Sequence, residues 1–180
     1  LIGLLCDYQG KLGIDEITFY KNSALKIDKS KVIDLLKRGA RLAVDDGKEN
    51  DFKKLKIDSD LRTEDAIERA SVVIDCTPKG IGHENKVKYY ENFANQVKGF
   101  IAQGSEDGFG KKYARGINDN ALSPDDKFIQ IVSCNTHNIS CLTKTIAFSE
   151  QSNNNLDKGD FLLMQIKSPL SKLLLLCSLK

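Results

Sequence analysis

The chain has 180 residues, 41% of them hydrophobic, which is enough to bury a core without disulfide bonds or metal ions. It carries 27 basic and 25 acidic residues, so the net charge of +2 gives no reason to expect nucleic acid or an anionic membrane as a partner. Its five cysteines form no CxxC pair and no zinc-type cluster with histidine. The composition therefore predicts a protein of a reducing cytoplasm with no metal site.

Two features concern the ends of the chain. The sequence opens without a charged-then-apolar signal segment, and its apolar run Leu173–Cys177 is too short to span a bilayer. The only methionine is Met164, whereas the first residue is Leu1, so we expect a further segment upstream.

The order of elements predicts an α/β fold: a Rossmann-like parallel sheet with helices on both faces, in which short apolar runs alternate with amphipathic segments. The expected strands are residues 1–6, 41–44, 71–78, 99–106 and 128–132. The expected helices are residues 29–38, 63–70, 85–93 and a last one that begins near residue 134 and reaches 148. Residues 107–127, which are polar and contain glycines, are predicted to form a long ordered loop. We expect a partial dinucleotide-binding domain over 1–132 and the start of a second domain over 133–180, with a strand beginning near residue 160.

Cys134 is the most informative residue of the chain. It stands between the apolar run 128–132 and a helix-compatible segment, with Ser133 before it and Asn135 after it. Unpaired backbone N–H groups and the positive end of the helix dipole would both point at its sulfur and favour the thiolate. This position predicts a nucleophile, whereas the ordinary fate of a free cysteine is a small buried hydrophobe.

Other residues at predicted strand ends have two interpretations each. Asp7 follows the expected first strand, where an acidic residue accepts ribose hydroxyls and selects NAD, but a lone aspartate there also forms turns. Gly104 would let the backbone approach a nicotinamide cofactor or would serve a plain turn. His137, three residues after the cysteine, is either its base or a first-turn residue facing solvent.

Three segments in this order resemble the archaeal-type (type II) glyceraldehyde-3-phosphate dehydrogenases. They are Val73–Gly82 with Asn85 and Lys86, then Gln103–Glu106, then Val132–Thr136. The corresponding family patterns are close to IDCTPxGxGxxNK, QGGE and VSCNTTG. The resemblance extends over roughly residues 1 to 165 and is strongest from 70 to 146.

The resemblance implies that Cys134 is the nucleophile, that Ser133 and Asn135 contact substrate, and that Gly104 approaches NAD or NADP. It also implies glyceraldehyde 3-phosphate and inorganic phosphate as substrates, a cysteine thioester as intermediate, and a homotetramer at full length.

The chain also departs from the family. By the resemblance, the glycine-rich first turn and the first strand of the sheet would lie upstream of Leu1, and residues 133–180 would begin an α+β catalytic domain. The catalytic histidine would lie downstream of residue 180, so we expect the chain to be inactive or nearly so on its own. Ser105 replaces a glycine, and the stretch 165–180 fits no family pattern. The alternatives are another thiol-dependent semialdehyde dehydrogenase and a non-catalytic nucleotide-binding module.

Overall fold

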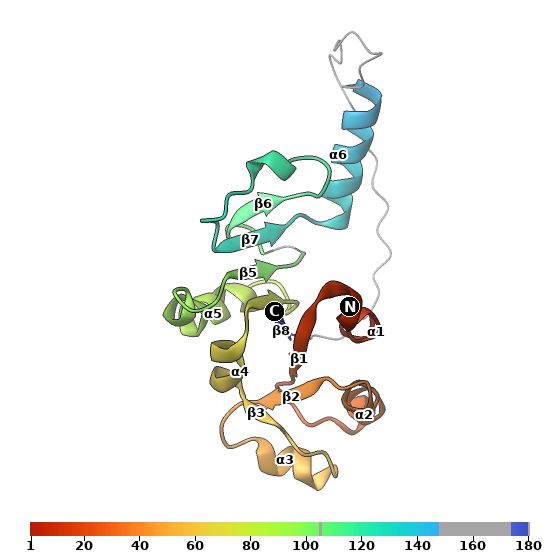
Figure 1. Ribbon diagram of the computed structural model, residues 1–180, viewed down its shortest axis with the longest axis vertical. Coiled ribbons are helices and arrows are strands. Elements are labelled where there is room, and N and C mark those ends of the chain that lie inside the picture. The colour runs from red at the N-terminus through yellow and green to blue at the C-terminus, as the bar shows by residue number, and fades with distance from the viewer. Residues whose placement is uncertain (105, 148–173, 180) are drawn as a thin grey trace.

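The protein folds around one eight-stranded sheet, which Figure 1 shows with its helices. The computed structural model describes residues 1–104, 106–147 and 174–179. The strand order is β3-β2-β1-β8-β4-β5-β7-β6. The strands are β1 (Ile14–Tyr20), β2 (Arg41–Val44), β3 (Leu61–Arg62), β4 (Val72–Asp75), β5 (Gly99–Ala102), β6 (Lys111–Tyr113), β7 (Phe128–Ile131) and β8 (Leu174–Leu179). The α-helices are α1 (Ile2–Leu12), α2 (Lys29–Lys37), α3 (Glu49–Lys54), α4 (Thr63–Arg69), α5 (Ile81–Lys88) and α6 (Cys134–Ala147).

Seven of the eight strands run in the same direction. The pairs β1–β2, β2–β3, β4–β5, β5–β7 and β6–β7 are parallel. β8 lies between β1 and β4 and runs antiparallel to both, with Tyr20 opposite Leu174 and Val72 opposite Cys177. Since β8 opposes both neighbours, β1 and β4 point the same way.

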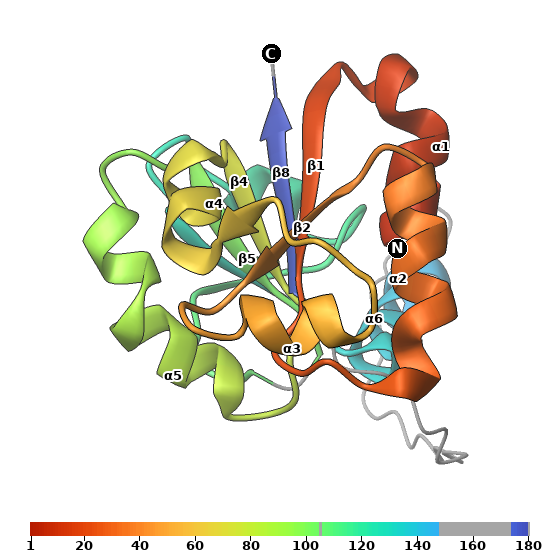
Figure 2. The same cartoon turned by 90° about the horizontal axis from the view of Figure 1, so that it is seen from below.

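Helices cover both faces of the sheet, as Figure 2 shows, with α1 and α2 on one side and α4 and α5 on the other. The alternation of side chains along β2 explains the two cores. Leu42 and Val44 belong to the cluster that includes Ile17 and Phe19, whereas Ala43 belongs to the cluster around Val73. Successive residues of a strand point to opposite faces, so a strand covered on both sides must be apolar throughout. The predicted Rossmann-like α/β fold is confirmed.

An aromatic group fills the core beneath α5. Tyr90 and Phe128 both stack on Phe100, with ring centroids 4.9 and 5.1 Å away, and Phe109 meets Tyr90 and Phe128 edge-on. Stacked and edge-to-face geometries of this kind add about 1 kcal/mol to each pair beyond the burial of area. This packing joins the 3₁₀ turn after α5, strands β5 and β7, and the segment after β5 into one body.

The prediction of a strand over residues 1–6 is wrong. These residues begin α1, and the first strand is β1, which starts after Gly13 at the end of that helix. Gly13 has φ of +65°, the left-handed conformation that ends helices and favours glycine. Ile2 and Leu5 lie on one side of α1 and pack on the core, so the short apolar run has helical rather than strand periodicity.

Two further predictions need adjusting. Residues 107–127 are not loop throughout, because Lys111–Tyr113 form the edge strand β6. The helix expected at 85–93 starts four residues earlier, as α5, and is followed by a 3₁₀ turn at Tyr90–Phe93. The strand expected near residue 160 lies outside the described residues, and the domain boundary at 132–133 stays a prediction.

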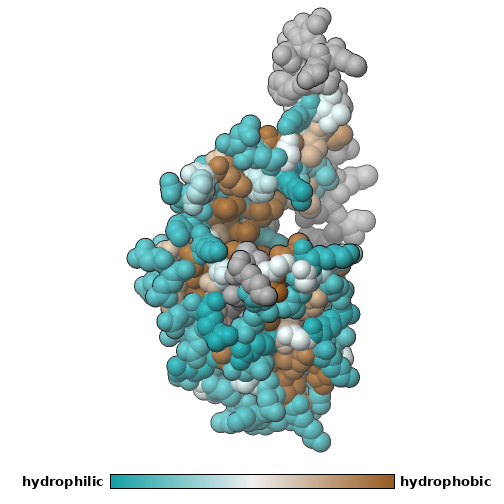
Figure 3. Space-filling model, in the orientation of Figure 1, coloured by the Kyte–Doolittle hydropathy of each residue, from teal (hydrophilic) through white to brown (hydrophobic). Residues whose placement is uncertain are grey.

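The face of the protein shown in Figure 3 is largely hydrophilic. Among the described helices, none has both the length and the apolar character needed to cross a membrane.

Two glycines offer a matched test of this packing. A Cβ on Gly110 would lie 2.1 Å from the carbonyl oxygen of Phe128, whereas a Cβ on Gly10, within α1, would meet no atom within 4 Å. Gly110→Ala should therefore lower the free energy of unfolding by about 3 kcal/mol, since backbone must move. Gly10→Ala should raise it by up to about 1 kcal/mol through helix propensity. Urea unfolding of both variants measures this, and a neutral Gly110→Ala would contradict the close approach of β6 to β7.

Candidate functional site

The shared strand direction gathers several chain segments at one edge of the sheet. β1, β2, β4, β5 and β7 end there, at Tyr20, Val44, Asp75, Ala102 and Ile131. In open parallel sheets, ligands bind beyond the carboxyl ends of the strands. Thr77 and two of the predicted site residues, Gly104 and Cys134, follow these ends.

Cys134 is the first residue of α6 and its side chain is exposed. Ser133 caps the helix: its Oγ accepts the backbone N–H of Thr136 at 3.2 Å, and its carbonyl accepts that of His137 at 2.9 Å. A serine in this position satisfies one free N–H of the helix start and fixes where the helix begins. The sulfur is therefore held at the helix N-terminus and open to solvent, with Asn135 Oδ1 3.9 Å away.

Two other cysteines differ from Cys134 in environment. Burial, reinforced by the neighbouring Asp75, raises the pKa of the Cys76 thiol to about 11. Burial also raises the pKa of Cys6 on α1. Both are therefore protonated and poorly nucleophilic at neutral pH.

The segment after β6 holds α6 in place. His137 donates from Nε2 to the carbonyl oxygen of Arg115 at 3.0 Å, and the Lys144 ammonium donates to the carbonyl oxygen of Gly116 at 2.6 Å. Tyr113 and Gly116 in turn donate to the carboxylate of Asp119. His137 therefore anchors the start of α6 through Nε2. Its role as a base for Cys134 stays a prediction.

Asp75, at the end of β4, is 1% exposed and accepts four hydrogen bonds. Its Oδ1 accepts the backbone N–H and the hydroxyl of Thr77, and its Oδ2 accepts Asn85 Nδ2 at 3.0 Å and the Tyr90 hydroxyl at 2.7 Å. Burial and the adjacent carboxylate raise the pKa of Tyr90. The phenol therefore stays protonated and donates its hydroxyl hydrogen to Asp75. One carboxylate thus fixes the turn after β4 and joins it to α5.

Lys86 joins the same region to the segment after β5. Its Nζ donates to the carbonyl oxygen of Phe109 at 2.8 Å and lies 4.4 Å from the centroid of the Phe128 ring. The side chain thus combines a hydrogen bond with a cation–π contact. The Asn-Lys pair of the sequence pattern therefore has a structural role in connecting α5 to its neighbours.

Gly104 follows β5 with φ of +72°, a backbone conformation that favours glycine. A Cβ there would meet no atom within 4 Å. The left-handed backbone of this turn therefore favours glycine, although the space beside Gly104 is open. Its contact with a cofactor stays a prediction.

The predicted position of Asp7 is wrong. It lies on α1, not at a strand end, and its carboxylate is half exposed and paired with the Arg38 guanidinium at 3.0 Å. Asp7 is therefore not at a strand end, where an acidic residue would accept the ribose hydroxyls of NAD.

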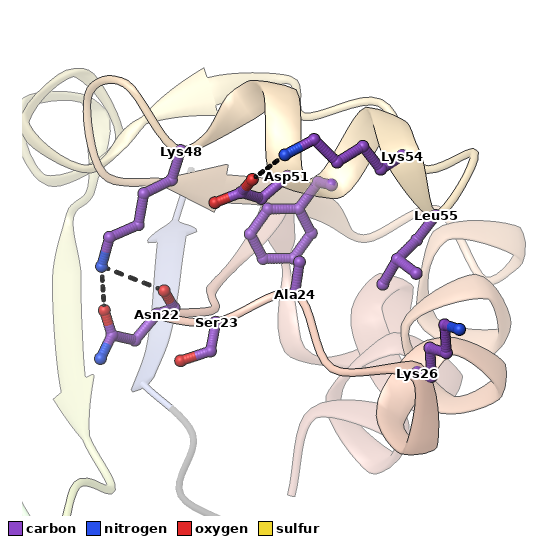
Figure 4. A pocket seen from close by; sticks show the side chains of 9 residues that line it. Asn22, Ser23, Ala24, Lys26, Lys48, Asp51, Lys54 and Leu55 are labelled. Carbon is purple, nitrogen blue, oxygen red and sulfur yellow. Dashed lines mark hydrogen bonds and ion pairs between the residues drawn. The ribbon is translucent and has the colours of Figure 1, made fainter.

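Asn22, two residues after the first strand of the structure, instead lines a pocket. A cavity of about 550 Å³ lies beside the loop after β1 and is lined by Asn22, Ser23, Ala24, Lys26, Lys48, Asp51, Phe52, Lys54 and Leu55. Figure 4 shows Lys48 reaching the backbone carbonyl and the side-chain oxygen of Asn22, and Lys54 paired with Asp51. Amide and ammonium groups of this kind suit a polar or anionic ligand. Sequence reasoning missed Asn22 and Lys48 because it missed β1, although Gly13 followed by an apolar run was a usable signal.

Within the described part of the chain, no group of three or more histidine, cysteine, aspartate or glutamate side chains is arranged to hold a metal ion.

Comparison with known proteins extends the sequence resemblance. The glyceraldehyde-3-phosphate dehydrogenase of Archaeoglobus fulgidus is 36% identical over 90 residues, which are 47% of this chain and 24% of that protein. The enzymes of the same name from Pyrobaculum arsenaticum and Methanobacterium bryantii are 37% and 32% identical over 93 and 124 residues. These matches cover 49% and 61% of this chain, and 25% and 36% of the relatives. No protein-family model matches the chain.

The chain resembles part of an archaeal glyceraldehyde-3-phosphate dehydrogenase. The predicted resemblance is thereby confirmed. The chain spans between 24% and 36% of the length of these curated relatives, so the matches concern one portion of such an enzyme.

The aspartate after β2 gives a pH-dependent test of this edge. Burial alone would raise the pKa of Asp45, but hydrogen bonds from Thr63, Tyr20 and Lys48 hold it below its usual value. A lowered pKa in the folded state gives stability that is present above the unfolded pKa of about 3.9 and is lost as pH falls through the folded pKa. Asp45→Asn should therefore lower the free energy of unfolding at pH 7, and its difference from wild type should shrink at pH 3.

Asp46 provides the control for this measurement, because its side chain is 82% exposed and lies 3.8 Å from Arg62. Asp46→Asn should change stability by less than about 0.5 kcal/mol at either pH. Urea unfolding at both pH values compares the two variants. An Asp45→Asn deficit that is the same at pH 3 and pH 7 would show that the ionised carboxylate is not what stabilises this edge.

Proposed function

We propose that the chain supplies the cofactor-side sheet edge and the reactive cysteine of a phosphorylating glyceraldehyde-3-phosphate dehydrogenase, acting in the cytoplasm on glyceraldehyde 3-phosphate. The observation that carries this proposal is the position of Cys134. It is an exposed thiol at a serine-capped helix start, on the edge where β4, β5 and β7 end. The similarity to archaeal enzymes of that name supports the choice of this reaction over that of other thiol-dependent semialdehyde dehydrogenases.

In the proposed reaction, the Cys134 thiolate attacks the aldehyde carbon to give a thiohemiacetal. Loss of a hydride from that carbon leaves a thioester on the same sulfur, which inorganic phosphate cleaves to 1,3-bisphosphoglycerate. NAD or NADP, when bound, accepts the hydride. Ser133 and Asn135, on either side of the sulfur, would contact the substrate.

The residues of this chain fit one part of a dinucleotide. The pocket after β1 offers the Asn22 amide and the Lys48 ammonium, and Gly104 leaves open space after β5. These groups would hold the polar ends of the cofactor. Lys48 is the side chain that contacts Asn22 in this pocket. Asp7 lies on α1 and is not part of it, so the choice between NAD and NADP does not rest on Asp7.

We also propose that the chain alone has little or no dehydrogenase activity. A base near the sulfur is needed to move the proton that the reaction releases. Both histidines of the chain donate to, or pair with, backbone carbonyls, His137 with that of Arg115 and His83 with that of Asp107. We therefore propose that His137 anchors α6 and His83 belongs to α5, and that neither serves as the base for Cys134. In the complete enzyme, which we propose to be a homotetramer, that group comes from elsewhere.

Alkylation tests the proposed nucleophile, and Cys141 is its matched control. Both thiols are exposed on α6, but Cys134 is at the helix N-terminus and Cys141 lies two turns inside. With iodoacetamide at pH 7, Cys134 should react at least several-fold faster, because only the helix start stabilises the thiolate. Glyceraldehyde 3-phosphate should slow the modification of Cys134 and not that of Cys141.

Peptide mapping by mass spectrometry reads both sites in one sample. Equal rates, or no protection by substrate, would remove the basis of the dehydrogenase proposal and favour the non-catalytic nucleotide-binding module.

A further inference from the structure

Glu106 is a second buried carboxylate at the sheet edge, and the proposed chemistry does not use it. It follows β5 by four residues and is 1% exposed. Its Oε1 accepts the backbone N–H of Gly80 at 2.5 Å, and its Oε2 accepts that of His83 at 3.3 Å. The Nε2 of the His83 ring lies 3.8 Å from the same oxygen. The carboxylate thus accepts hydrogen bonds from the backbone at the start of α5.

The start of α5 lacks a cap of its own. Gly80 is the N-cap residue and has no side chain to accept the free N–H groups of the first turn. Those groups carry the positive end of the helix dipole, so a carboxylate supplied from another segment is favourable there. Glu106 therefore does for α5 what Ser133 does for α6, from 26 residues away in sequence.

Two glycines make room for this contact. Gly80 has φ of +91°, which other residues rarely adopt, and Gly82 is buried against the Glu106 side chain. A Cβ on Gly82 would lie 3.0 Å from Cγ and 3.1 Å from Oε2 of Glu106. A glycine pair after a strand suggests a cradle for a ligand phosphate. Here a carboxylate of the protein already occupies that place.

The turn before α5 is thus held at both ends. Asp75 accepts the N–H and hydroxyl of Thr77, and Glu106 accepts the N–H groups of Gly80 and His83. Between them, Lys79 is exposed. The two carboxylates fix the backbone of the turn that follows β4 on the ligand side of the sheet.

We propose that Glu106 is a positioning residue of this edge: its carboxylate occupies the N-terminus of α5, fixes the turn of residues 77–83, and closes that helix start to ligand phosphate. Its consequence for cofactor binding rests on the proposed function. The cofactor phosphates are then held by other parts of the edge, and the turn that carries the exposed Lys79 keeps a fixed backbone.

The test compares Glu106→Gln with Glu84→Gln, which neutralises an exposed glutamate in the first turn of the same helix. In ¹⁵N-labelled chain at pH 7, the Gly80 and His83 amide protons of Glu106→Gln should move upfield and exchange with solvent at least ten-fold faster. Glu84→Gln should leave both unchanged. Titration with NADH should show a several-fold higher Kd for Glu106→Gln and an unchanged one for Glu84→Gln.

Gly82→Ala is the second variant. It keeps the Glu106 carboxylate, but the added Cβ would displace that side chain, so the same two amide hydrogen bonds should weaken. Unchanged Gly80 and His83 amides in both variants would overturn the proposal. Lost amide hydrogen bonds with unchanged NADH affinity would limit Glu106 to the fold and overturn its role at the site. If wild type itself bound no NADH, the cofactor part of the proposed function would fail, and the amide resonances would still decide whether Glu106 holds the turn.

Discussion

The carboxylate of Asp75 is the constraint from which the candidate site is built. It ends β4, is buried, and accepts hydrogen bonds from Thr77, Asn85 and Tyr90. Leaving any of these partners unpaired in the interior would cost about 1 to 3 kcal/mol, so the turn, α5 and the aromatic core are fixed together. Tyr90 also stacks on Phe100, so this tyrosine connects the hydrogen bonds of Asp75 to the packing of the sheet.

The parallel direction of the strands places this turn beside other segments of the candidate site. β4, β5 and β7 end side by side, and the segments after them carry Thr77, Gly104 and Cys134. β8 begins at the same edge, with Leu174 opposite the last residue of β1. The edge thus brings together segments that are far apart in sequence, and the helix start with its exposed thiol is one of them.

The sequence predicted the parts of the fold that depend on local pattern. The start of α6 was predictable because Ser133 is a cap former beside Cys134, and the buried strands β4, β5 and β7 were predictable from apolar runs. The first element was not, because a run of six apolar residues suits a buried strand as well as one face of a helix. Taking it as a strand displaced Asp7 to a strand end and hid β1, and with it Asn22. Asp75 reaches Asn85 and Tyr90, and Glu106 reaches Gly80 and His83, across 10 to 26 residues of sequence, and no local pattern reveals these contacts.

Binding of the cofactor at the carboxyl edge of the sheet can be measured by mapping NADH onto the backbone amides of the ¹⁵N-labelled chain. We expect the perturbed amides to lie in the segments after β1, β4, β5 and β7, around Asn22, Thr77, Gly104 and Cys134. Perturbation at the opposite edge, around Gly39 and Ile57, or no perturbation at saturating NADH, would contradict the account.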